Sequence, residues 1–200
     1  MIDEIAFIGD VHGHVLALES ILRAVLNRRI PEAVLLGDYV NKGPASKEVL
    51  NLLTSWNNQD LELQALQGNH ERVFLSALDS GDLRPLLKMA GAPTVRSYVG
   101  GDVGSDAFAD FSASVPDSHR EFLKSLPHSY YSHGVTARHE QTHDASSFVV
   151  SAHVNIGFVP IIDATSARID TGCGSGGRLT AFFWPSRAYI QCTEAGGTVA

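Results

Sequence analysis

Residues 5–13 of this chain read IAFIGDVHG, a short apolar run that leads directly into a polar turn. The same arrangement recurs at 33–38, which read AVLLGD, and at 61–71, where LELQAL is followed by QGNHE. Short apolar runs that end at glycine are typical of buried strands. The sequence therefore predicts three buried strands, each followed by aspartate, asparagine or histidine.

Helical periodicity fills the intervals next to these strands. Apolar residues recur on one face from Val15 to Arg28, and Pro44 is placed to open a second helix. Residues 71–78 predict a third helix, and a fourth is expected to begin around Asp117, after Pro116. Alternating strands and helices predict an α/β fold, in which chemistry lies beyond the carboxyl ends of the strands.

The second half of the chain predicts more strand than helix. Residues 148–150 suit another buried strand, which runs toward His153. Residues 179–184 and 187–192 flank a Pro-Ser turn and predict a β-hairpin.

The chain length predicts one domain, which we expect to span 1–193. Within it, about 80–128 are expected to form a cap of helices and loops, because the Gly- and Ser-rich interval 91–113 has only weak periodicity. The last residues, 194–200, are expected to be a flexible, frayed tail.

Composition narrows the class of protein. The 200 residues are 44% hydrophobic and 18% charged, which excludes a disordered chain or a coiled coil. No window approaches the length of an uncharged membrane helix, so no membrane partner is expected. The net charge of −7 disfavours a nucleic-acid partner. The acidic start, Met1 to Glu4, is unlike a signal peptide, and we expect a cytoplasmic protein with Cys173 and Cys192 reduced.

The polar residues after the strands are of the types that bind divalent metals. Asp10 and His12 follow the first strand, Asp38 the second and Asn69 the third. Carboxylate, imidazole and amide oxygen together suit Mn²⁺, Fe²⁺ or Zn²⁺. Singly, each aspartate could be a helix cap and His153 a packed core histidine. Three similar corners after three apolar strands favour a shared metal site.

These motifs resemble the signature blocks of the calcineurin-like metallophosphoesterases. The matching segments are GDVHG at 9–13, GDYVNKG at 37–43 and GNHE at 68–71. They are most similar to the bacterial serine/threonine phosphoprotein phosphatase branch, whose closing blocks resemble 151–153 and 170–180. The resemblance implies an α/β/β/α sandwich with mixed sheets and a dinuclear metal site at the strand ends.

The resemblance also implies a role for each matching residue. Two divalent ions would be bound, with Mn²⁺ expected first and Fe, Zn, Ni or Mg as alternatives. The implied ligands are Asp10, His12, Asp38, Asn69, His153 and one further histidine, with Asp38 as the bridge. His70 would be the general acid, oriented by Asn41, while Lys42 and Arg72, or Arg178, would bind the phosphate oxygens.

The further histidine is where the sequence departs from the family. No His-Ala-Gly block occurs, and the segment from Tyr130 to Ser147 is shorter than its family counterpart. His139 is the first choice, because it lies about where the block would fall, followed by His133 and His143. A fourth possibility is that no histidine replaces the block and that the second metal site is weakened.

Asn41 and Lys42 form the second departure, because the family has Asp-Arg there. Asparagine can accept a hydrogen bond from an imidazole but raises its pKa less than a carboxylate does. Lysine supplies charge without the two-pronged geometry of arginine. A plain alternative is that both are ordinary loop residues.

The implied activity is metal-dependent hydrolysis of phosphate monoesters, in phosphoserine or phosphothreonine proteins or in small phosphate esters. A symmetrical diadenosine tetraphosphate hydrolase is the alternative enzyme. A degenerate, non-catalytic relative that binds metal or phosphate is the alternative outside enzymes. Cys173 precedes a Gly-rich segment with Arg178, but a cysteine nucleophile would leave the three metal-type corners unexplained.

Overall fold

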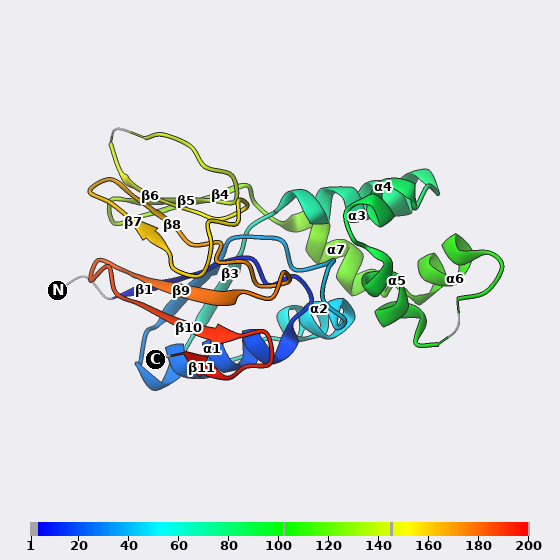
Figure 1. The fold of residues 1–200 in the computed structure, drawn as a ribbon, viewed down its shortest axis with the longest axis horizontal. Helices are drawn as coiled ribbons and strands as arrows, with labels where there is room; N and C mark the ends of the chain where they lie inside the picture. Colours follow the sequence, from blue (N-terminus) through cyan, green and yellow to red (C-terminus); the bar gives the residue numbers. More distant parts are fainter. Residues whose placement is uncertain (1–3, 102, 145, 200) are drawn as a thin grey trace.

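Two mixed β-sheets lie face to face in the computed structural model, which describes residues 4–101, 103–144 and 146–199 (Figure 1). The larger sheet has the strand order β11-β10-β9-β1-β2-β3, and the smaller has the order β4-β5-β6-β8-β7. This architecture confirms the predicted α/β sandwich of mixed sheets.

In the larger sheet, β1, β2 and β3 are parallel, β9 runs antiparallel to β1, and β10 runs antiparallel to β9. Its strands are β1 (Ile5–Ile8), β2 (Glu32–Leu35), β3 (Glu62–Ala65), β9 (Arg178–Trp184), β10 (Tyr189–Thr193) and β11 (Thr198–Val199).

In the smaller sheet, β5, β6 and β8 are parallel, and the edge strands β4 and β7 are antiparallel to their neighbours. Its strands are β4 (Ser129–Ser132), β5 (Val135–Arg138), β6 (Phe148–Ser151), β7 (Ile161–Ile162) and β8 (Ser166–Arg168).

Every helix of the described residues precedes β4. α1 packs on β9 and β10, on the face of the larger sheet that points away from the smaller one, and the other helices gather at one side of the molecule (Figure 1). The helices are α1 (Val15–Asn27), α2 (Ser46–Thr54), α3 (Asn69–Ser80), α4 (Arg84–Lys88), α5 (Ala92–Val99), α6 (Ala107–Ser114) and α7 (Asp117–Ser125). None of the described helices has the length and apolar character needed to cross a membrane.

The central strands have buried side chains on both faces, as their continuous apolar runs predict. Phe7 belongs to the core between the sheets, whereas Ile8 belongs to the core under the helices. Between the sheets, Phe148 stacks on Phe182 and Trp184 with ring centroids 5.8 and 4.6 Å apart.

Two segments are more regular than the sequence predicts. The interval 91–113 contains α5 and α6, whose aromatic residues pack together: the Tyr98 and Phe111 ring centroids lie 5.6 Å apart. At the end of the chain, Val199 pairs with Gln191, so the expected frayed tail adds a strand to the larger sheet. Both differences come from tertiary packing, which overrides weak local signals.

Two loops of the larger sheet are fixed to one another through Glu71. Its buried carboxylate accepts hydrogen bonds from the backbone N–H groups of Asp38 and Tyr39, both at 2.8 Å, and of Gly68 at 2.9 Å. The loop after β2 is therefore held against the loop after β3. Gly68 allows this approach, because a Cβ there would lie 2.5 Å from the backbone nitrogen of Asp38.

We expect Gly68→Ala to force the two loops apart and to lower the free energy of unfolding by about 1–3 kcal/mol, the usual cost of overpacking. Gly101→Ala is the matched control, because none of the described residues beyond its chain neighbours lies within 4 Å of the added methyl group. Urea denaturation of both variants measures the difference. Equal stabilities would show that the loops separate freely.

Candidate metal centre

Polar side chains from five loops meet at the carboxyl ends of the central strands. They follow β1, β2 and β3 in the larger sheet and β5 and β6 in the smaller one. The residues brought together are Asp10, His12, Asp38, Asn69, His70, His139 and His153. Most of their side chains are buried; Asn69 is half-buried and His153 is exposed.

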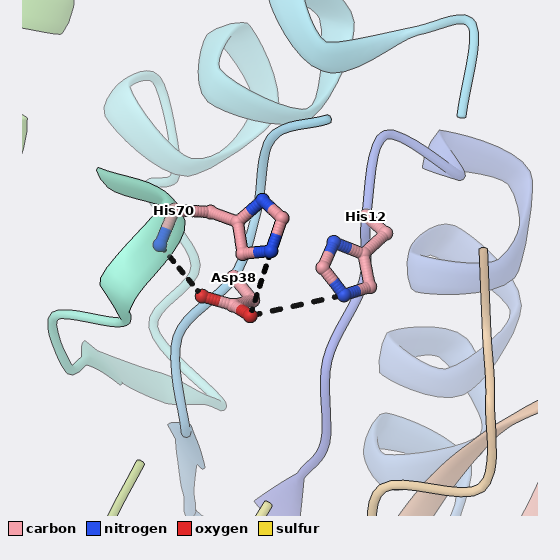
Figure 2. A group of neighbouring side chains, drawn as sticks. All are labelled: His12, Asp38 and His70. Atoms are coloured by element: carbon pink, nitrogen blue, oxygen red, sulfur yellow. Dashed lines mark hydrogen bonds and ion pairs between the residues drawn. The ribbon is translucent and has the colours of Figure 1, made fainter. Parts of the chain in front are cut away.

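The first group consists of His12, Asp38 and His70 (Figure 2). Both imidazole rings point toward the Asp38 carboxylate, with Oδ2 at 3.8 Å from His12 Nε2 and 3.7 Å from His70 Nε2. Asp10 Oδ2 also lies 3.8 Å from His12 Nε2. This group could hold one metal ion.

The second group consists of Asp38, His139 and His153. Asp38 Oδ1 lies 3.3 Å from His139 Nε2. Asn69 Oδ1 lies 2.9 Å from His139 Nε2 and 3.0 Å from His153 Nδ1. Asp38 therefore presents one carboxylate oxygen to each group, and the second group could hold another ion.

The hydrogen-bond chemistry of both groups fits a bound cation. His139 Nδ1 lies 3.0 Å from the Leu36 carbonyl, so it carries the proton and leaves Nε2 as a lone pair. That lone pair faces Asn69 Oδ1, which is also an acceptor. Both carboxylate oxygens of Asp10 are buried without a hydrogen-bond partner among the described residues. A bound divalent cation would satisfy acceptor atoms that cluster in this way.

Burial lowers the pKa values of the imidazoles, which favours metal ligation, and raises those of the carboxyl groups, which a bound cation would lower again. It raises the pKa of Asp10 and Asp38, and each carboxylate is further raised by negative neighbours, Asp38 and Glu71 respectively. It lowers the pKa of His12, and it lowers that of His139 to about 3. The imidazoles are therefore neutral at neutral pH, as metal ligation requires.

Left-handed backbone conformations cluster at the site. The non-glycine residues His12, Asp38 and His153 have φ values of 46°, 55° and 72°. Asn41 and Lys42 follow at 71° and 63°. Such conformations cost energy in residues with a Cβ and concentrate where function requires them.

Asn41 holds His70 in a way that differs from the expected one. Its amide Nδ2 lies 2.8 Å from His70 Nδ1, while its Oδ1 accepts a hydrogen bond from the Thr94 hydroxyl at 3.1 Å. We expected Asn41 to accept a hydrogen bond from the imidazole N–H, but here the amide N–H donates one to His70 Nδ1. The neutral His70 proton is therefore on Nε2, the atom that faces Asp38. Burial lowers the His70 pKa to about 4.

Thr94 and Glu71 are the functional residues that sequence reasoning missed. Thr94 comes from α5, is fully buried and also accepts the Asn41 backbone N–H at 2.8 Å. No motif surrounds it, so nothing in the sequence signals its role. Glu71 lies within the GNHE motif, which was the available signal.

Lys42 and Arg72 lie on different sides of the centre. Lys42 Nζ donates to His12 Nε2 at 2.7 Å, inside the first group. Arg72 is exposed, and its guanidinium pairs with Glu140 at 2.9 Å. Arg178 bonds Gln191 at 3.1 Å and packs over the Phe158 ring.

The other two histidine candidates lie outside the cluster. His133 is exposed in the turn between β4 and β5, so the whole length of β5 separates it from His139. His143 is exposed in the segment that follows Glu140. Cys173 is buried, and burial raises the pKa of its thiol, which argues against a thiolate nucleophile.

Several solved structures share this fold. A candidate diadenosine tetraphosphatase has a TM-score of 0.69 and 22% identity, covering 96% of this chain and 93% of its own. A metallophosphoesterase from Sphaerobacter thermophilus has a TM-score of 0.61 and 16% identity, covering 100% and 89%. A serine/threonine phosphatase from Saccharomyces cerevisiae has a TM-score of 0.53 and 13% identity, covering 96% and 79%.

Sequence comparison identifies the family. No curated protein matches the chain significantly. The family model for calcineurin-like phosphoesterases, however, matches residues 4–154, which include every residue of both ligand groups. The chain therefore belongs to the calcineurin-like phosphoesterase family.

Proposed function

We propose that this protein is a metal-dependent phosphatase that hydrolyses phosphate monoesters, with phosphoserine or phosphothreonine proteins and small phosphate esters as substrates. Membership of the family points to hydrolysis of phosphate esters. The observation that carries the proposal is the pair of ligand groups that share Asp38, the first of which includes His70.

Six side chains would hold two metal ions. Asp10 and His12 would bind the first ion, Asp38 would bridge, and Asn69, His139 and His153 would bind the second. When bound, two divalent ions make water more acidic and offset the negative charge of the phosphate. The nitrogen and oxygen donors suit Mn²⁺ first, with Fe, Zn, Ni or Mg as alternatives.

His70 would act on the leaving group. As the imidazolium, it would give the proton on Nε2, the atom 3.7 Å from Asp38 Oδ2, to the oxygen that departs from phosphorus, and it would be left as the neutral ring. Asn41 and Thr94 keep the ring in this orientation. They would act as positioning residues, because neither faces the shared carboxylate.

Lys42 would bind a non-bridging phosphate oxygen. Its ammonium already lies in the first group, at 2.7 Å from His12 Nε2. When that nitrogen ligates a metal, the ammonium must turn to another acceptor, and a substrate phosphate offers one. Lysine would supply a point charge there, without the fork of an arginine.

Two observations bear on the competing functions. The position of His139 beside Asn69 and Asp38 supplies the donor whose absence favoured a non-catalytic relative. The similarity in fold to a candidate diadenosine tetraphosphatase keeps the symmetrical tetraphosphate hydrolase as the second candidate.

Turnover of p-nitrophenyl phosphate, a phosphoserine peptide and diadenosine tetraphosphate with Mn²⁺ would separate the three candidate functions. Metal-loaded protein that turned over none of them would contradict an enzymatic function.

The first prediction concerns metal content. We expect about two ions per chain in the unaltered protein and about one in His139→Ala, together with a loss of activity of at least about 100-fold. His133→Ala is the control, because that histidine is exposed in a distant turn, and it should retain both ions. Elemental analysis of protein prepared without chelator measures this. Two ions in His139→Ala would remove His139 from the ligand set.

The second prediction concerns the charge beside His70. Asn41→Asp should raise the His70 pKa, because a carboxylate stabilises the imidazolium form. We expect turnover of phenyl phosphate, whose phenolate is a poor leaving group, to rise about 3- to 10-fold relative to turnover of p-nitrophenyl phosphate. Asn58→Asp, on the surface, controls for added charge. An unchanged ratio would argue against His70 as the proton donor.

The third prediction concerns Thr94. Thr94→Val removes the hydroxyl that fixes the Asn41 amide, so kcat should fall about tenfold with KM and metal content nearly unchanged. Thr94→Ser restores the hydroxyl and should recover most of the rate. If serine fails to rescue, Thr94 acts through packing.

A further inference from the structure

A positively charged pocket adjoins the second ligand group. It is a cavity of about 310 Å³, lined by Gln67, Arg72, His128, Arg138, His139 and Glu140 among others. His139 is common to both places: its ring contacts Asn69 and Asp38 in the metal centre and also lines the pocket. The pocket therefore borders the metal centre at this ring.

The charges of the pocket suit an anion. Its lining contains two arginines, Arg72 and Arg138, and one glutamate, Glu140, which pairs with Arg72. This local excess of positive charge occurs in a chain whose net charge is −7. The Arg72–Glu140 pair is solvent-exposed, so it contributes little and exchanges readily for a stronger anion.

Arg138 has a hydrogen-bond donor that a bound anion could satisfy. Its Nη2 bonds the Tyr131 hydroxyl. Its Nε–H, by contrast, is buried and has no hydrogen-bond partner among the residues that the structure describes. A buried donor of this kind normally finds a partner, and a phosphate oxygen is the acceptor whose geometry best matches a guanidinium.

We propose that this pocket binds the second phosphate of an oligophosphate substrate, while the first phosphate lies at the metal centre. The inference rests on the proposed phosphatase function. It adds that the substrate class includes molecules with consecutive phosphates. Hydrolysis then adds water across the phosphoanhydride bond and yields two shorter phosphates, with no other reactant.

The test compares inorganic tripolyphosphate with p-nitrophenyl phosphate, which has one phosphate, in excess Mn²⁺. Arg138→Gln should raise the KM and the dissociation constant for tripolyphosphate about tenfold, the effect of one lost charge-assisted hydrogen bond. It should leave p-nitrophenyl phosphate kinetics unchanged. Arg168→Gln, on β8 of the same sheet, is the matched control and should change neither.

Glu140→Gln provides a test of opposite sign. Removal of the competing carboxylate should tighten tripolyphosphate binding about threefold, which general destabilisation would not do. If Arg138→Gln changed the KM of both substrates equally, or of neither, the proposed role of the pocket would be wrong. The same would follow from an Arg138-dependent KM for a singly phosphorylated peptide but not for tripolyphosphate.

Two further arms separate the remaining explanations. Diadenosine tetraphosphate that shows the same Arg138 dependence, at a lower KM than tripolyphosphate, would identify nucleotides as the source of the phosphates. Equal KM values would identify the phosphate chain alone. Arg138-dependent binding of tripolyphosphate, without hydrolysis of any phosphate ester, would keep the pocket and overturn the proposed function.

Discussion

The rest of the site depends on one buried carboxylate. Glu71 accepts three backbone hydrogen bonds, from Asp38, Tyr39 and Gly68, and so joins the loop after β2 to the start of α3. Those two loops carry the shared aspartate, the Asn69 amide and the His70 ring. The left-handed backbone at Asp38 persists because these hydrogen bonds over-determine it. A buried carboxylate outside the two ligand groups thus positions three side chains of the centre, Asp38, Asn69 and His70.

The metal centre gathers groups that oppose one another without a cation. Asp10 and Asp38 are both buried, and burial together with their mutual repulsion raises the pKa of Asp10. Acceptor atoms of His139 and Asn69 face one another at 2.9 Å. Such an arrangement lowers the stability of the chain alone, and metal binding would recover it, because a ligand that binds only the folded state stabilises that state.

The short segment between β5 and β6 has two consequences. Near its end it contacts β5, where the hydroxyls of Thr136 and Ser147 lie 2.6 Å apart. It also begins with His139 and Glu140, so the same few residues contribute to the metal centre and to the wall of the adjacent charged pocket. Arg72 and Arg138 line that pocket beside them.

The sequence by itself determined the strands β1, β2 and β3, the helices between them, the C-terminal hairpin and the polar corners, because each depends on local periodicity or adjacent residues. It left three histidines open as the further ligand. The structure favours His139 because Arg138 pairs with Ser151 across β5 and β6, which brings the ends of both strands, and so His139 and His153, to one edge. The Thr94–Asn41 contact spans 53 residues, and the Arg138 pocket joins α3, β5 and the loops next to them. Only the tertiary structure decided these, since no local pattern records which distant residues strand register and helix packing bring together.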